Sequence, residues 1–222
     1  AAQAQLQLAK IFTDDMVLQR NKPVPVWGKY IPGYEIKVSI GRDTKMTIAD
    51  HDSSWRVVLS PQRANADPQS LVISTKSDTI VLKNLLIGDL WVCIGQSNME
   101  WPMIKEKHFK EEIDHSCQPL MRFFNPVYAG KNIFGTTFTD SVVQFLTQHK
   151  FYKGKWQHCD STTFKTMSAV AYYFGKEIVN NISVPVGLIN LSIGGAPLET
   201  FIAKDALENS KIFRKKIMGD WL

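Results

Sequence analysis

Two glycine-containing loops carry the residues whose types and spacing could support ester chemistry. Ser97 closely follows the apolar segment 90–94, and Gly95, two positions before it, permits a tight turn. Asn98 adds a polar side chain beside the hydroxyl. A serine exposed by a sharp turn after a buried strand is placed to act as a nucleophile, although Met99 stands where a G-x-S-x-G elbow has its last glycine. The alternative is that Ser97 caps the following helix, a frequent role of serine.

A second loop, residues 192–197, follows another apolar segment and contains the pair Gly194-Gly195. Glycines let the backbone approach a ligand closely, and Pro197 fits the first turn of a helix. Backbone N–H groups of this loop could therefore converge on a developing negative charge, as an oxyanion hole requires. The alternatives are an ordinary strand-to-helix turn and, with less support because no Gly-Lys-Ser/Thr sequence follows, a phosphate site. Glu199 could orient the loop or contact a sugar, or could interact with a helix dipole.

The segments that must position these loops predict an open α/β sheet. Residues 85–87 and 90–94 are near-continuous apolar stretches, as expected for strands covered on both faces of a parallel sheet, and residues 121–124 and 184–191 are further strand candidates. Ligands of such sheets bind beyond the carboxyl ends of the strands. We therefore expect both loops to emerge at one edge of the sheet.

A helix is predicted over residues 169–180, with Ser168 as its N-cap. Its apolar residues recur with helical spacing. The predicted stripe consists of Val170, Tyr173, Phe174 and Ile178.

The first part of the chain has a different pattern, of short strands separated by turn residues. Strands are expected at 24–27, 35–40, 55–59 and 71–75. Two prolines in and beside the first of these favour an edge strand. We predict a small antiparallel β-sandwich over residues 1–84, followed by the α/β domain over residues 85–222.

Composition narrows the possible functions. The 222 residues are 44% hydrophobic and 21% charged, which is typical of a globular protein, and no apolar run approaches the ~18 residues of a membrane span. The net charge of +5 comes from scattered basic residues, apart from the cluster 214–216, so we expect neither nucleic acid nor membrane as a partner. Cys93, Cys117 and Cys159 lack metal-ligand spacing, and no metal or other cofactor is expected.

The start of the sequence bears on localisation. Ala1-Ala2-Gln3-Ala4 is similar to the small-residue tail of a cleaved secretory signal. This similarity favours a secreted or periplasmic protein.

Several blocks together resemble one known family, the sialate O-acetylesterases, which have an SGNH-type (GDSL-like) hydrolase fold. The Gly-Gln-Ser-Asn-Met block in its long flanking context is specific, whereas the glycine pair alone would be weak. The matching blocks span nearly the whole chain: Asp15–Arg20, Gly88–Trp91, Gly95–Pro102, Ser168–Phe174, Pro185–Asn190 and Gly194-Gly195.

The resemblance implies an SGNH-like three-layer parallel sheet, incomplete in this chain, preceded by the β-sandwich. It implies that Ser97 attacks an O-acetyl ester on a carbohydrate, with sialic acids as the expected substrates. The N–H group of Ser97 and that of Gly194 or Gly195 would stabilise the oxyanion, and Gln96, Asn98 and Glu199 complete the expected substrate-binding set.

The sequence departs from this family in one respect. Family members complete their site with a Gln-Gly-Glu-type block and an Asp-x-His or Asp-x-x-His segment, and neither appears after the glycine loop here. None of the five histidines present is a good candidate for the base: His51, His108, His115, His149 and His158. A serine without a base is a poor nucleophile. We therefore expect a C-terminal segment or a second polypeptide to complete the site. The rival hypothesis is a non-catalytic carbohydrate-binding or scaffolding module.

Overall fold

The computed structural model describes residues 5–131, 133, 135–147 and 150–214. The Ala1–Ala4 stretch that favours export, His149, and Lys215 and Lys216 of the basic cluster lie outside these residues. Among the described residues, no helix is long and apolar enough to cross a membrane.

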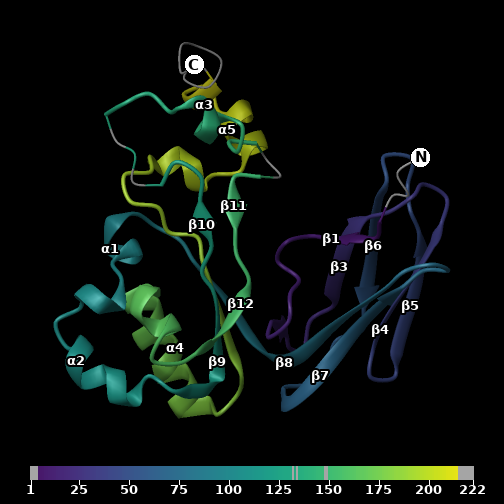
Figure 1. Ribbon diagram of the computed structural model, residues 1–222, viewed down its shortest axis with the longest axis horizontal. Helices are drawn as coiled ribbons and strands as arrows, with labels where there is room; N and C mark the ends of the chain where they lie inside the picture. The colour runs from purple at the N-terminus through teal and green to yellow at the C-terminus, as the bar shows by residue number, and fades with distance from the viewer. Residues whose placement is uncertain (1–4, 132, 134, 148–149, 215–222) are drawn as a thin grey trace.

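The protein has an α/β fold built on one large mixed sheet. A three-stranded antiparallel sheet lies against its antiparallel half, and a two-stranded ribbon rises beside its parallel half (Figure 1). The large sheet has the order β12 (Trp156–Cys159), β9 (Gln118–Phe124), β13 (Val186–Asn190), β8 (Thr79–Cys93), β7 (Asn65–Ser74), β4 (Glu35–Ile40) and β5 (Asp43–Ile48), with β2 (Val17–Gln19) pairing beside β8. The small sheets are β1 (Gln7–Leu8), β3 (Val24–Lys29) and β6 (Ser54–Leu59), and β10 (Val127–Tyr128) with β11 (Tyr152–Lys153).

The helices are short except for one. Among the helices that lie wholly within the described residues, α4 has 14 residues and the others have between three and six. The α-helices are α1 (Ser97–Glu100), α2 (Phe109–Glu112), α3 (Asp140–Val143), α4 (Ala169–Ile182) and α5 (Lys204–Asn209), and the 3₁₀ helices are η1 (Met103–Lys105), η2 (Ile113–His115), η3 (Thr163–Thr166) and η4 (Leu198–Phe201).

Strand β8 joins the antiparallel and parallel parts of the large sheet. It pairs antiparallel with β7 over its first half and in parallel with β13 from Asp89 to Cys93. The segments predicted separately at 85–87 and 90–94 are therefore one strand. A Cβ at Gly88 would collide with the carbonyl oxygen of Pro185, so glycine allows β8 to approach the chain just before β13. The predicted boundary after residue 84 falls inside this strand, where Asn84 has a φ of 58°.

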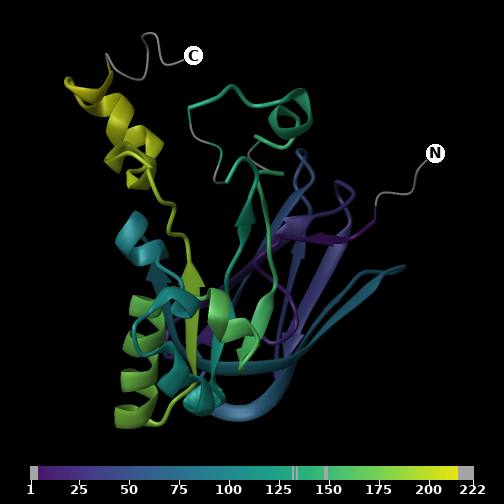
Figure 2. The ribbon, with the colours of Figure 1, turned by 60° about the vertical axis from the view of Figure 1, so that its left-hand side comes forward.

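The parallel part of the sheet positions the two loops. β13 lies between β8 and β9 and runs parallel to both, and β12 adds an antiparallel edge. Helix α4 packs on one side of these strands, and the N-terminal strands lie on the other (Figure 2). The predicted N-cap of α4 is confirmed, because the Ser168 hydroxyl accepts a hydrogen bond from the Ala171 N–H at 3.2 Å.

The predicted apolar stripe of α4 is correct only in part, because Tyr173 and Ile178 pack half-buried against the core but its other two members do not. Val170 and Phe174 are 50% and 41% exposed, whereas Ala171, Tyr172 and Gly175 are buried. The face with Ala171, Tyr172 and Gly175 lies against the sheet, because Gly175 lets the helix approach β13 closely. A Cβ there would lie 2.7 Å from Leu188 Cδ1 in β13.

The N-terminal strands form a core that continues into the parallel part. Strands β4 and β6 are confirmed, because alternate residues such as Ile36, Val38, Trp55 and Val57 are buried in this core. The predicted edge strand, β3, is instead the middle strand of its sheet. Its neighbour β1 reaches only the far end of β3, so the proline-containing part pairs on one side alone.

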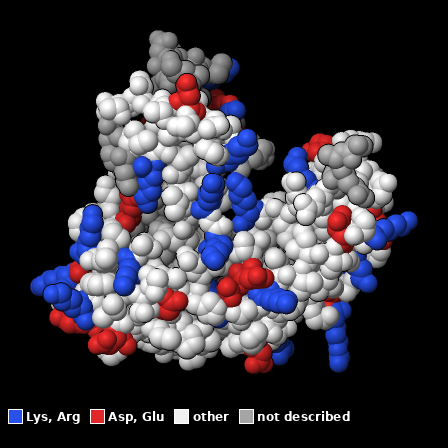
Figure 3. Space-filling view, viewed as in Figure 1, with Lys and Arg blue, Asp and Glu red and all other residues white. Residues whose placement is uncertain are grey.

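The surface in Figure 3 shows a notch between the two parts of the molecule. Basic side chains gather near the middle of this face, with acidic side chains close to several of them. No single sign of charge covers the face.

Candidate active site

The two predicted loops lie side by side at the carboxyl edge of the sheet. Asn190 pairs with Cys93 at the ends of β13 and β8. Beyond that pair, the Leu191 N–H donates to the Cys93 carbonyl at 2.9 Å, and the Ile193 N–H donates to the Gly95 carbonyl at 3.0 Å. The backbone hydrogen bonds between the two segments thus continue beyond the ends of the strands. They hold the serine turn beside the diglycine loop, as the strand order predicted.

Ser97 is exposed at the start of helix α1. The N-cap position belongs to Gln96, and no side chain caps the helix, so the alternative in which Ser97 is a capping residue is wrong. Within the described residues its hydroxyl makes no hydrogen bond. Gly95 takes a φ of 153°, and a Cβ there would lie 3.0 Å from Met99 Cβ, so a glycine is needed to make the turn. The arrangement leaves a hydroxyl free to meet a substrate.

The diglycine loop faces this hydroxyl. A Cβ added to Gly194 would lie 3.7 Å from Ser97 Oγ. The Gly194 N–H itself donates to the Glu100 carboxylate at 2.5 Å, and the second oxygen of Glu100 lies 2.7 Å from Lys131 Nζ. Gly195 has a φ of 77°, in the left-handed region that favours glycine.

The other predicted site residues have distinct positions. The Gln96 side-chain amide donates to the Ala196 carbonyl and so ties the serine turn to the diglycine loop. Asn98 is exposed beside Ser97, and Glu199 lies half-buried in η4 after the loop.

Two neighbouring hollows open beside helix α1, and Ser97 lines the first of them. The first, of about 430 Å³, is lined by Gln96, Ser97, Asn98, Met99 and Val170. The second, of about 580 Å³, shares Asn98 and Val170 with the first and adds the rings of Trp101 and Tyr173 and the cation of Lys107. The exposed ring of Trp101 and the half-buried ring of Tyr173, beside polar groups, are suited to the mixed apolar and polar faces of a sugar.

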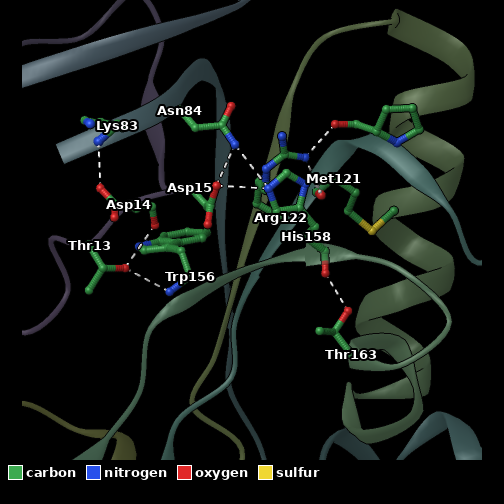
Figure 4. A network of polar contacts seen from close by, with 11 residues as sticks. Thr13, Asp14, Asp15, Lys83, Asn84, Met121, Arg122, Trp156, His158 and Thr163 are labelled. Atoms are coloured by element: carbon green, nitrogen blue, oxygen red, sulfur yellow. Dashed lines mark hydrogen bonds and ion pairs between the residues drawn. The ribbon is translucent and has the colours of Figure 1, made fainter.

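None of the described histidines lines these hollows. His108 Nδ1 lies 2.8 Å from Glu111 on α2. His158 lies 2.9 Å from Asp15 and contacts Asn84, in the polar network shown in Figure 4. His158 pairs with Arg122, level with Gly187 and Leu90 near the start of the parallel pairing of β8 and β13. Ser97 lies beyond Cys93, where that pairing ends. That none of the described histidines is the catalytic base therefore stays a prediction.

Cys93 is not a competing nucleophile. It is 6% exposed, and burial raises the pKa of its thiol to about 11. The thiol is neutral at physiological pH and faces the core that α4 covers. This agrees with its prediction as an inert buried residue.

Sequence reasoning missed Glu100 and Lys131. Glu100 lies three residues after Ser97, so both side chains project from one face of a single helical turn. The Ser-x-x-Glu spacing was available as a signal, but it is typical of a capping box. Lys131 follows β10, and its approach to Glu100 depends on tertiary structure alone.

The chain is similar to curated esterases over most of its length. It is 26% identical to the sialate O-acetylesterases of Pongo abelii and Homo sapiens over 216 and 215 residues, which cover 91% of this chain and 40% of each relative. The sialate O-acetylesterase of Rattus norvegicus is 25% identical over 219 residues, covering 91% of this chain and 38% of that relative. No protein-family model matches the sequence.

A solved structure is similar as well. A carbohydrate acetylesterase from Xanthomonas citri superimposes with a TM-score of 0.77 and 26% identity, over 92% of this chain and 44% of that chain. The chain thus spans about two fifths of the length of the curated relatives it matches. Together these similarities confirm the resemblance predicted from the motif blocks.

Proposed function

We propose that this chain, a homologue of the sialate O-acetylesterases, supplies the nucleophile and the oxyanion donors for hydrolysis of O-acetyl esters on carbohydrates. The observation that carries the proposal is the juxtaposition of an exposed, unbonded Ser97 hydroxyl with the diglycine loop, within the described residues. Acetylated sialic acids are the proposed substrates, and the hollows with Trp101 and Tyr173 are the proposed sugar-binding region.

The proposed reaction follows the general course of serine esterases. Ser97 Oγ attacks the carbonyl carbon of the acetyl ester while its proton passes to a base, and the carbonyl oxygen becomes an oxyanion held by backbone N–H groups. The intermediate collapses, the sugar oxygen leaves with a proton, and the acetyl group stays on Ser97. Water then attacks this ester and releases acetate.

The base and its partner acid are proposed to come from polypeptide that the described residues do not include. An apolar groove of about 730 Å³ supports a docked segment. It lies on the face of β8 and β13 opposite α4, where Val92 and Ile94 are 58% and 45% exposed, and it extends to Trp27 and Phe151. Parallel sheets normally have both faces covered. We propose that a segment corresponding to the unmatched part of the longer relatives fills this groove.

This proposal has a direct test in a charged substitution on the groove. Val92→Lys should leave the unfolding midpoint of this chain nearly unchanged, because the side chain is already exposed. In the full-length protein the same change should bury an unpaired charge and lower esterase activity. Full activity in that variant would contradict the docked segment.

Two finer features complete the proposal. The covered parallel sheet would then have the SGNH-type layering, and the N-terminal strands would form the β-sandwich that precedes it. Export to the periplasm or the cell exterior is also proposed, on the basis of the small residues at positions 1–4.

An esterase assay on the full-length protein tests the function. A chromogenic aryl acetate, an O-acetylated sialic acid and acetylated xylan would be compared, each with wild type, Ser97→Ala and Ser70→Ala. Ser70 is an exposed serine in β7 and serves as the control. We expect Ser97→Ala to abolish turnover, Ser70→Ala to retain it, and the sialic acid ester to be preferred. Equal turnover with alanine at position 97 would refute the assignment.

A further inference from the structure

Glu100 forms a clamp between three elements at the proposed site. It ends helix α1, its Oε2 accepts the Gly194 N–H of the diglycine loop at 2.5 Å, and its Oε1 lies 2.7 Å from Lys131 Nζ of the segment after β10. Its side chain is only 22% exposed. Hydrogen bonds from backbone N–H groups to a carboxylate are among the stronger ones in proteins.

The contact with Glu100 determines which glycine N–H group is still available to bind an oxyanion. The Gly194 N–H is already bonded to Glu100. Within the described residues the N–H groups of Gly195 and Ser97 make no hydrogen bond beyond their own elements. The left-handed φ of 77° at Gly195 turns the backbone sharply at this point.

We propose that Glu100 is a positioning residue, which holds Gly194 so that the Gly195 N–H, with that of Ser97, binds the oxyanion. This inference rests on the proposed function. Glu100 does not touch the substrate in this account; it acts through the loop it holds.

Lys131 has a second task in the same arrangement. The Glu100 carboxylate lies on the side of Gly194 that also faces Ser97 Oγ, where negative charge develops during attack. An uncompensated carboxylate near that position would oppose the reaction, because Coulomb interactions are strong where water is partly excluded. The Lys131 ammonium group neutralises it.

Substitutions separate the two tasks. Glu100→Ala removes the acceptor and the charge, so kcat should fall about 10- to 100-fold, comparable to the loss of one oxyanion donor, with KM within about threefold. Glu100→Gln keeps an oxygen that can accept from Gly194, and kcat should stay within about threefold of wild type. Lys131→Met leaves the carboxylate unpaired, and kcat should fall at least about tenfold.

The double variant Glu100→Gln with Lys131→Met distinguishes the proposed charge compensation from a merely structural role of Lys131, because it measures the effect of Lys131→Met on kcat when position 100 carries no charge. Once the charge at position 100 is absent, removing Lys131 should change kcat by less than about threefold. Lys176→Met, which breaks the 2.5 Å contact with Glu112 away from the loops, controls for the loss of an ion pair and should leave kcat unchanged.

The outcomes distinguish this inference from the proposed function. All of these variants would be assayed in the full-length protein beside Ser97→Ala, with thermal unfolding to confirm that each is folded. If Ser97→Ala is fully active, the proposed function fails. If Ser97→Ala is inactive but Glu100→Ala keeps wild-type kcat, or if Lys131→Met is equally harmful with Gln at position 100, the positioning role is overturned.

Discussion

Gly194→Ala gives the most detailed prediction about the diglycine loop. An alanine Cβ at this position would overlap Glu100 Oε2 and would lie 3.7 Å from Ser97 Oγ. The Glu100 side chain can rotate away, so the protein should fold, but the hydrogen bond from Gly194 is then lost. A hydrogen bond to a charged group contributes about 1.5–3 kcal/mol.

The expected fall in kcat follows from the fraction of molecules in which the diglycine loop is ordered. If that bond holds the loop in its competent arrangement, losing about 1.5–3 kcal/mol lowers the competent fraction and kcat by about 10- to 150-fold, at about 1.4 kcal/mol per factor of ten. The assay is steady-state hydrolysis of an acetylated carbohydrate by the full-length protein, with the melting temperature measured in parallel.

A double-mutant cycle makes the prediction refutable. In Glu100→Ala the atom that the new Cβ would strike is absent, and the hydrogen bond is already broken. Gly194→Ala should therefore add little when it is combined with Glu100→Ala, and the double variant should resemble the slower single variant. Losses that multiply, or a Gly194→Ala enzyme with wild-type kcat, would refute the reasoning.

Two further predictions concern the scaffold. Gly88→Ala should lower the free energy of unfolding by about 1–3 kcal/mol in urea titrations, because the new Cβ would strike the Pro185 carbonyl at the junction of β8 and β13; an unchanged midpoint would show that the strands are not this close. At pH 8, iodoacetamide should modify exposed Cys117 at least about 100-fold faster than Cys93, whose pKa burial raises to about 11. Because that folded-state pKa is raised, the neutral Cys93 thiol favours the native state below about pH 9, and this contribution is lost as pH rises toward 11; rapid alkylation of Cys93 in the native protein would contradict its burial.

Local sequence patterns identified several elements because each pattern reports which face is buried. Alternation located β4 and β6, and the apolar run 121–124 lies within β9. Ser168 marked the start of α4 because its hydroxyl caps the helix. The placement of both loops at one edge followed from the parallel order of β8 and β13.

Long-range contacts explain what the sequence did not reveal. β8 continues through Gly88 because a neighbouring backbone requires a small residue there, whereas glycine by itself usually suggests a turn. The buried face of α4 depends on the close fit of Gly175 against Leu188, which turns Val170 and Phe174 of the predicted stripe toward the surface. The contact of Glu100 with Gly194 joins positions 94 residues apart, and no local pattern encodes it.

The central claim, that Ser97 carries the acetyl group, is tested most directly by trapping the intermediate. The full-length protein would be mixed with an aryl acetate and quenched in acid within milliseconds, and its peptides would be analysed by mass spectrometry. We predict an acetyl ester on Ser97 that hydroxylamine removes and that is absent from Ser97→Ala. Turnover of the ester with Ser97 unmodified and a hydroxylamine-sensitive acetyl group on another residue would contradict the account.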